Sequence, residues 1–157
     1  MTNRERDRHV VLDDVSRSII EQLQQDGRRS YARIAAAVGL SEAAVRQRVQ
    51  RLLDAGVMQI VAVTDPMQLG FYRQAMIGVR VSGDTRVIAD KLAAMPSVDY
   101  VVLTAGNFDI LAEVVCENDD ELIDLLNSEI RTLEGVSSTE TFVYLRLHKQ
   151  LYDWGTR

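Results

Sequence analysis

The first third of the chain contains three stretches in which apolar residues recur at spacings of three and four, the pattern of amphipathic helices. The stretches cover residues 13–27, 30–39 and 41–54, and Asp13 and Ser41 can cap the N-termini of the first and the third. Gly39 can adopt the left-handed conformation that a sharp turn between the second and third stretches requires. The pattern therefore predicts three helices, of which the last two are joined by a tight turn.

The third predicted helix has two distinct faces. At 100° per residue, Val45, Val49 and Leu52 form one apolar stripe, which we expect to pack against the other two helices. The opposite face carries a small residue followed by long hydrogen-bond donors, as is typical of the second helix of a helix-turn-helix. Its members are Ala43, Arg46, Gln47, Gln50 and Arg51.

A short apolar segment follows this module. Residues 57–63 favour a β segment, and the pair Asp65-Pro66, which disfavours helix, ends it. The first module is therefore predicted to be a winged helix-turn-helix, followed by a hinge.

The second half of the chain alternates strand and helix patterns. Residues 74–82 place every second side chain on one apolar face, as in a β-strand. The helical stripes from Val87 to Met95 and from Leu122 to Ile130 are expected to face a sheet. The order βαββαβ predicts an α+β, ferredoxin-like domain, an antiparallel four-stranded sheet with two helices on one face. The expected strands cover residues 74–82, 98–105, 109–116 and 138–148.

Helices on one side leave the other face of this sheet uncovered. A face that met water would be mostly polar, but apolar side chains predominate on it. An apolar face that the chain itself does not cover implies a partner. A second copy of the chain, stacked sheet to sheet with two-fold symmetry, would cover this face. The sequence therefore predicts a homodimer. The residues expected on this face are Met76, Leu111, Val115, Phe142 and Tyr144, with Arg80, Glu113 and Arg146.

Composition limits the class of protein. With 157 residues, 46 % of them hydrophobic, the chain can form the core of one ordinary domain or of two small ones. It has no run of about 18 apolar residues and no recognisable secretion signal, so we expect a cytoplasmic protein without a membrane partner. Cys116, expected in the core, and two histidines give neither a disulfide nor a zinc site, so no metal or cofactor is expected.

Charge is distributed unevenly along the chain. The net charge is −5, but residues 1–60 hold ten arginines and eight acidic residues, whereas residues 61–157 carry a net charge of −7. This asymmetry suggests that the first module meets a polyanion. The expected divisions are a mobile leader (1–10), the helix-turn-helix (11–60), a linker strand (61–73), the ferredoxin-like domain (74–148) and a tail (149–157).

Since a helix-turn-helix places its second helix in the major groove, the exposed donors predict contacts with double-stranded DNA. The same residues also fit a merely solvated, arginine-rich face. Ala43, near the helix start, belongs to the predicted DNA-binding face, and Ser30 and Ser41 are candidates for backbone contacts. The candidates for base contacts are Arg46, Gln47 and Gln50, and those for phosphate contacts are Arg29, Arg33, Arg48 and Arg51.

Several motifs, in their order and spacing, resemble the leucine-responsive regulatory protein/AsnC family of transcriptional regulators. They include Val38-Gly39-Leu40-Ser41, Arg48-Val49, Gly56-Val57, Thr104-Ala105-Gly106-Asn107-Phe108-Asp109 and the segment 135–141. The resemblance implies dimers that assemble further, commonly into octamers. It also implies a small effector, usually an amino acid, bound between dimers at the hairpin turn.

The chemistry of the turn fits such an effector in part. Asp109 can pair with an α-ammonium group, while backbone N–H groups and strand hydroxyls can receive a carboxylate. The family's usual Asp and Tyr are replaced here by Asn107 and Phe108, which removes a charge and a hydroxyl. The same residue types are also expected in an ordinary turn and in an ordinary β-strand that bind no effector. The predicted effector residues are Gly106, Asn107, Phe108, Asp109, Ser138, Thr139 and Thr141.

Two other functions compete with an effector-modulated regulator. An architectural protein that compacts DNA without an effector fits the sequence almost as well. The siroheme decarboxylases resemble these regulators but use histidines of the second module as acids, and His148 is the only histidine of this module here. Because no other catalytic motif occurs either, we expect no enzyme.

Overall fold

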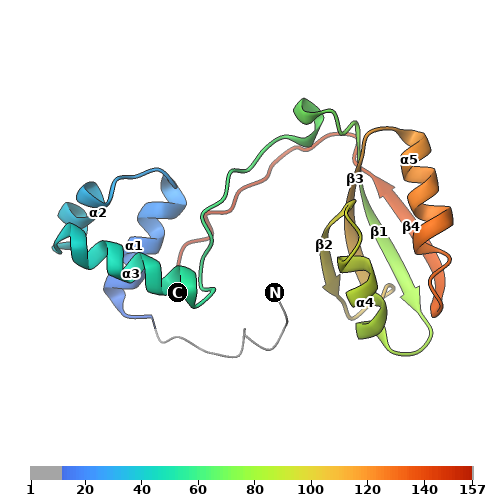
Figure 1. The fold of residues 1–157 in the computed structure, drawn as a ribbon, viewed down its shortest axis with the longest axis horizontal. Helices are drawn as coiled ribbons and strands as arrows, with labels where there is room; N and C mark the ends of the chain where they lie inside the picture. The colour runs from blue at the N-terminus through green and yellow to red at the C-terminus, as the bar shows by residue number, and fades with distance from the viewer. Residues whose placement is uncertain (1–11, 157) are drawn as a thin grey trace. The chain divides into compact units, whose positions relative to one another are not determined.

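A computed structural model describes residues 12–156, which form two compact units (Figure 1). Residues 12–62 together with 149–156 make the first unit, and residues 63–148 make the second. Within the first unit, the Thr156 hydroxyl donates to the Glu21 carboxylate at 2.5 Å. The end of the chain therefore belongs to the same unit as its first helices. The expected leader at residues 1–10 lies outside the described range.

The first unit contains three helices, α1 (Asp14–Gln25), α2 (Tyr31–Val38) and α3 (Glu42–Asp54). Each begins with an N-cap whose side chain accepts a backbone N–H three residues on, at 2.8 Å for the Asp13 carboxylate and 3.2 Å for the Ser41 hydroxyl. Gly39 has φ +70°, which allows the tight turn between α2 and α3. The core is formed by Ile19, Leu23, Ile34, Ala35, Val45 and Val49.

The segment after α3 differs from the prediction. Residues 57–63 form no strand, and the expected wing and linker strand are therefore absent from the described chain. Val61 and Val63 are 67 % and 60 % exposed, so their apolar pattern has no packed surface and no neighbouring strand to pair with. A short 3₁₀ helix, η2 (Pro66–Leu69), begins where the Asp65 carboxylate accepts the Met67 N–H at 3.0 Å.

The second unit has the predicted βαββαβ order and antiparallel sheet. The strand order in the sheet is β2-β3-β1-β4, the ferredoxin-like arrangement. The elements are β1 (Arg73–Val81), α4 (Thr85–Ala93), β2 (Val98–Leu103), β3 (Ile110–Cys116), α5 (Asp119–Asp124), its π-helical continuation η3 (Leu125–Ile130) and β4 (Val136–Val143).

Both helices pack on one face of this sheet. Ile77, Val79, Ile110 and Val114 are fully buried there together with Leu92 of α4. Cys116 is also buried in this core, and burial raises the pKa of its thiol to about 11.

Two details of the second unit correct the prediction. Val87 is 49 % exposed, because α4 uses the stripe through Ile88 and Leu92 to cover the sheet. Strand β4 ends at Val143 instead of residue 148, since its neighbour β1 begins at Arg73 and offers no further partner. The last bond runs from the Tyr144 N–H to the Gln74 carbonyl at 2.8 Å.

No helix among residues 12–156 covers the other face of the sheet. Strand register pairs Met76 with Glu113 on one side and with Phe142 on the other, which places these three side chains on this face. The Gln74 amide donates to the Glu113 carboxylate at 2.8 Å, so the acid on this face has a partner. Phe142 is 44 % exposed. The arrangement agrees with the apolar, unpartnered face predicted from the sequence.

Candidate nucleic-acid interface and effector site

Helix α3 presents its predicted polar face to solvent. Val45, Val49 and Leu52 are at most 4 % exposed and anchor the helix to α1 and α2. The face opposite to them is exposed throughout. It carries Ala43, Arg46, Gln47, Gln50 and Arg51.

Two of the candidate base-contacting side chains are already oriented by neighbours. The Arg46 guanidinium forms an ion pair with Glu42 at 3.0 Å and lies 5.1 Å from the centre of the Tyr31 ring. The Gln50 amide donates to the Asp54 carboxylate at 2.7 Å. Gln47 has no such contact among the described residues.

Arg48 lies on the flank of α3 and points to α1. Its guanidinium donates to the Asp13 carboxylate at 2.6 Å and to the Ser16 hydroxyl at 3.2 Å. Hydrogen bonds from Ser16, followed by the one from Arg48, lower the pKa of Asp13 to about 2. Arg48 therefore ties α3 to the N-cap of α1, and its proposed contact with phosphate stays a prediction.

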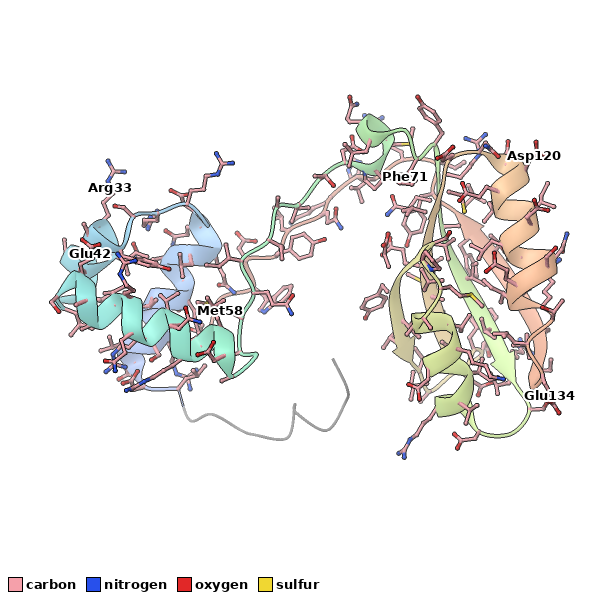
Figure 2. The ribbon with its side chains drawn as sticks, in the orientation of Figure 1. Arg33, Glu42, Met58, Phe71, Asp120 and Glu134 are labelled. Carbon is pink, nitrogen blue, oxygen red and sulfur yellow. The ribbon has the colours of Figure 1, made fainter. Side chains whose placement is uncertain are left out.

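The other arginines are held less tightly. Arg29 donates to the Gln22 side chain and, at 3.4 Å, to Gln25, neither of which neutralises its charge. Within residues 12–156, the guanidinium groups of Arg33 and Arg51 form no hydrogen bond, ion pair or ring contact. Figure 2 shows Arg33 pointing away from the helices. These cations are available to an anion from outside.

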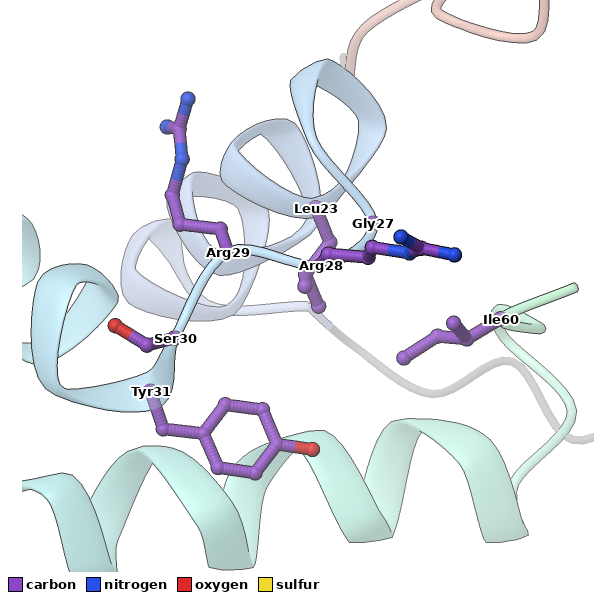
Figure 3. Close-up of a pocket in the computed structure, with 7 residues that line it drawn as sticks. All are labelled: Leu23, Gly27, Arg28, Arg29, Ser30, Tyr31 and Ile60. Atoms are coloured by element: carbon purple, nitrogen blue, oxygen red, sulfur yellow. The ribbon is translucent and has the colours of Figure 1, made fainter. Parts of the chain in front are cut away.

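A hollow of about 270 Å³ lies between the end of α1 and the start of α2 (Figure 3). Its wall contains Arg28, a cation that the sequence analysis did not single out although it stands beside Arg29. The hydroxyls of Ser30 and Ser41 serve as helix caps, so only their remaining lone pairs and protons are free for a ligand. The hollow is lined by Leu23, Gly27, Arg28, Arg29, Ser30, Tyr31 and Ile60.

The predicted effector turn joins β2 to β3. The Thr104 N–H donates to the Asp109 carbonyl at 2.9 Å, and the Thr104 hydroxyl donates to the Phe108 carbonyl at 2.7 Å. One oxygen of the Asp109 carboxylate accepts the Val81 N–H at 2.8 Å. Gly106 and Asn107 are exposed at the tip. Asp109 thus fixes the turn to β1 with part of its hydrogen-bonding capacity.

Phe108 folds from this turn onto the open sheet face. Its ring lies on Gly78 of β1, where an added Cβ would stand 2.7 Å from the ring. The Arg80 guanidinium lies 5.6 Å from the ring centre, and Phe142 meets the ring edge to face at 6.0 Å. Sequence reasoning missed Gly78 in this cluster, although a glycine inside a strand is a known signal of close approach.

The three predicted hydroxyls of β4 do not lie on one face. Register pairs Thr139 with Val79 and Thr141 with Ile77, on the face covered by helices. The Thr139 hydroxyl accepts a bond from Arg131 at 2.9 Å, and the buried Thr141 hydroxyl has no partner in the described chain. Ser138, opposite Arg80, is the one on the open face with Phe108. One copy of the chain therefore does not group all the predicted effector residues.

Among residues 12–156, no group of three or more His, Cys, Asp or Glu side chains is arranged to hold a metal ion. No helix in that range is long and apolar enough to cross a membrane.

A helix-turn-helix with an exposed donor face, joined to an α+β domain with an open apolar sheet face, defines a DNA-binding regulator. Comparison with known families agrees. Residues 12–53 match the AsnC-type helix-turn-helix domain, and residues 71–157 match a C-terminal dimeric alpha+beta barrel domain of AsnC-type regulators. The chain belongs to the AsnC/Lrp family of transcriptional regulators.

Individual relatives support this assignment. The HTH-type transcriptional regulator FL11 of Pyrococcus furiosus is 34 % identical over 89 % of this chain and 93 % of its own length. The structure of Escherichia coli AsnC matches with a TM-score of 0.79 at 27 % identity, covering 91 % of this chain and 98 % of AsnC. A Neisseria meningitidis transcriptional regulator solved with L-Met has the same fold, with a TM-score of 0.78 at 22 % identity over 90 % of this chain and 95 % of its own. These relatives are named as regulators, which agrees with the regulator predicted from the sequence.

Proposed function

We propose that this regulator binds specific sequences of double-stranded DNA through α3, and that a small effector, an amino acid, changes its DNA affinity or its oligomeric state. The observation that carries the first part is the row of exposed donors on α3, backed by a buried apolar stripe. Amide and guanidinium groups there have the reach and the geometry to bind base edges in the major groove. With a role on DNA, we expect the protein to act in the cytoplasm.

Phosphate contacts would come from the arginines around α3. Arg33 and Arg51 have no partner within the described chain, and Arg29 keeps its full charge. Cations of this kind release counterions from DNA and set the register of a binding domain without sequence preference.

A homodimer is the proposed functional unit. The open sheet face carries Met76, Leu111 and Phe142, and the matched C-terminal domain family is described as dimeric. A two-fold dimer presents two copies of α3 to two half-sites, which favours an operator with two-fold symmetry. We further propose that these dimers assemble into octamers.

The effector is proposed to bind where copies meet at the hairpin turn. Gly106 and Asn107 offer exposed backbone N–H groups for a carboxylate, and Asp109 has a second carboxylate oxygen for an ammonium group. The Neisseria meningitidis regulator solved with L-Met supports the choice of an amino acid, since its fold is the same.

The DNA-binding part is tested with the full-length protein. Sequences selected from a random duplex library define the preferred site, and anisotropy titrations then compare Gln47→Ala with Gln24→Ala, a control on α1. Gln47→Ala is expected to relax the preference at one base pair by about 1–3 kcal/mol, and the control should change nothing. Wild-type protein that binds no duplex at low salt would refute the proposal.

An architectural role without an effector is the second candidate. It is favoured by the existing bonds of Asp109 to Val81 and of Thr139 to Arg131, which leave less hydrogen-bonding capacity for a ligand. Each of the twenty amino acids is titrated while thermal stability and DNA affinity are measured. A shift with one of them supports sensing, whereas no shift with any of them supports the architectural role.

A further inference from the structure

Arg46 makes two contacts with neighbouring side chains, more than any other donor on the exposed face of α3. It is the fifth residue of the helix and lies one turn after Glu42, with which it pairs at 3.0 Å. Its guanidinium carbon lies 5.1 Å from the centre of the ring of Tyr31, the first residue of α2. Figure 3 shows this ring lying over α3. Two elements of the helix-turn-helix thus converge on one cation.

These contacts leave Arg46 open to an external partner. Its side chain is 65 % exposed and that of Glu42 is 52 % exposed, so neither is enclosed. The ion pair uses one terminal nitrogen of a group that has five N–H donors in a planar fork. The remaining donors can still form a bidentate contact.

The Tyr31 ring is anchored by the core of the first unit. It is half-buried and packs against the apolar cluster of the first unit. A guanidinium over such a ring is restricted by the cation–π attraction before it meets any ligand. Restricting a long side chain in advance lowers the entropic cost of the contact that it makes later.

We propose that Tyr31 and Glu42 are positioning residues that hold Arg46 ready for a bidentate contact with guanine, which makes Arg46 the main determinant of base preference in α3. The inference rests on the proposed function, in which α3 enters the major groove. Guanine is the base whose major-groove edge offers two acceptors, N7 and O6, to one guanidinium fork. Gln47 has no positioning contact among the described residues, so its base preference is expected near the lower end of the range for such contacts, about fivefold.

The first experiment locates the guanine. A site is selected from random duplexes with the full-length protein, and affinities are then measured for duplexes in which each G·C pair is replaced. Arg46→Ala is expected to lower the preference for guanine at one position of each half-site by about 5- to 150-fold. An unchanged preference at every position overturns the role of Arg46, while continued selective binding leaves the proposed function intact.

The second experiment isolates the positioning residues. Tyr31→Leu, which keeps apolar packing but removes the ring, should lower the preference at the same position by about two- to fivefold. Tyr31→Phe, which keeps the ring, should retain it. Affinity for an unrelated duplex and the thermal unfolding temperature serve as controls, since a merely structural role of Tyr31 would change both and leave the base ratio unaltered.

Glu42→Gln keeps the proposal testable if Tyr31→Leu does not fold, because Glu42 is on the surface. Removing this carboxylate lessens repulsion from phosphate, so affinity for every duplex should rise while the guanine preference at the Arg46 position falls. Loss of preference at that position in both variants supports the inference. If Arg46→Ala removes the preference and neither Tyr31→Leu nor Glu42→Gln alters it, the positioning role is overturned and base recognition by Arg46 remains.

Discussion

The ring of Phe108 lies directly on the backbone of Gly78, 30 positions earlier in the chain, on the sheet face that no helix covers. An added Cβ would stand 2.7 Å from the ring, so the ring must lift if residue 78 gains a side chain. Because the ring also contacts Arg80 and Phe142, the hairpin turn is coupled to the surface proposed for the second copy. The turn proposed to bind an effector and the face proposed for the dimer are thus parts of one packing arrangement.

Gly78→Ala should therefore destabilise the second unit by about 1–3 kcal/mol through overpacking. The φ angle of Gly78 is not positive, so the backbone itself accepts alanine. In a Phe108→Ala background the same change should be close to neutral, and the pair of measurements forms a double-mutant cycle. Denaturant unfolding gives both values. Equal costs in the two backgrounds would show that the ring is not the obstacle.

Arg51→Ala should flatten the salt dependence of DNA binding, with the slope of log affinity against log salt reduced by about one. Arg51 has no partner in the described chain and is free to neutralise a phosphate. Because Arg48 is already paired with Asp13, Arg48→Ala should change this slope less. Arg86→Ala, on α4, is the control. A slope that changes with Arg48→Ala and not with Arg51→Ala would reverse this assignment of roles.

The lowered pKa of Asp13 predicts how acid affects the stability of the first unit. Its folded-state pKa of about 2 lies below the ordinary value of 3.8, so the ionised carboxylate stabilises the folded state above pH 3.8. That contribution is lost as the pH falls from 3.8 through about 2. Asp13→Asn should consequently unfold more easily than wild type near neutral pH, with the difference vanishing towards pH 2. Thermal unfolding over this range measures it, and a difference independent of pH would argue that the bonds from Ser16 and Arg48 do not stabilise the ionised carboxylate.

Phe142→Asp should break the proposed dimer, because it places a charge on the apolar sheet face opposite Met76. Light scattering of the variant is expected to show monomers or aggregates. Ile123→Asp is the matched control, since Ile123 is 51 % exposed on α5, which packs on the other face. A folded Phe142→Asp variant with the wild-type oligomeric state would exclude this face as the interface.

Local chemistry explains why much of the fold could be predicted. Helix starts depend on a single side chain and the N–H groups next to it, so Asp13 and Ser41 were visible as caps in the sequence. The inward stripe of α3 follows from helical geometry alone, and Val45, Val49 and Leu52 are buried as expected. The βαββαβ order could also be predicted from such local patterns.

Features that depend on distant neighbours were missed. Residues 57–63 have the apolar composition of a strand but no strand to pair with, and β4 stops where β1 begins. Thr139 and Ser138 were grouped as one set of hydroxyls, although consecutive residues of a strand point to opposite faces. The contact of Arg48 with Asp13 joins residues 35 positions apart, and no short motif encodes it.

The bond between Thr156 and Glu21 bears on how the protein is made. Residues 149–156 belong to the same compact unit as α1, α2 and α3, so this unit is not continuous in the sequence. During synthesis, which proceeds from the N-terminus, α1, α2 and α3 emerge before residues 149–156. The contact between Glu21 and Thr156 therefore forms only after the second unit has been translated.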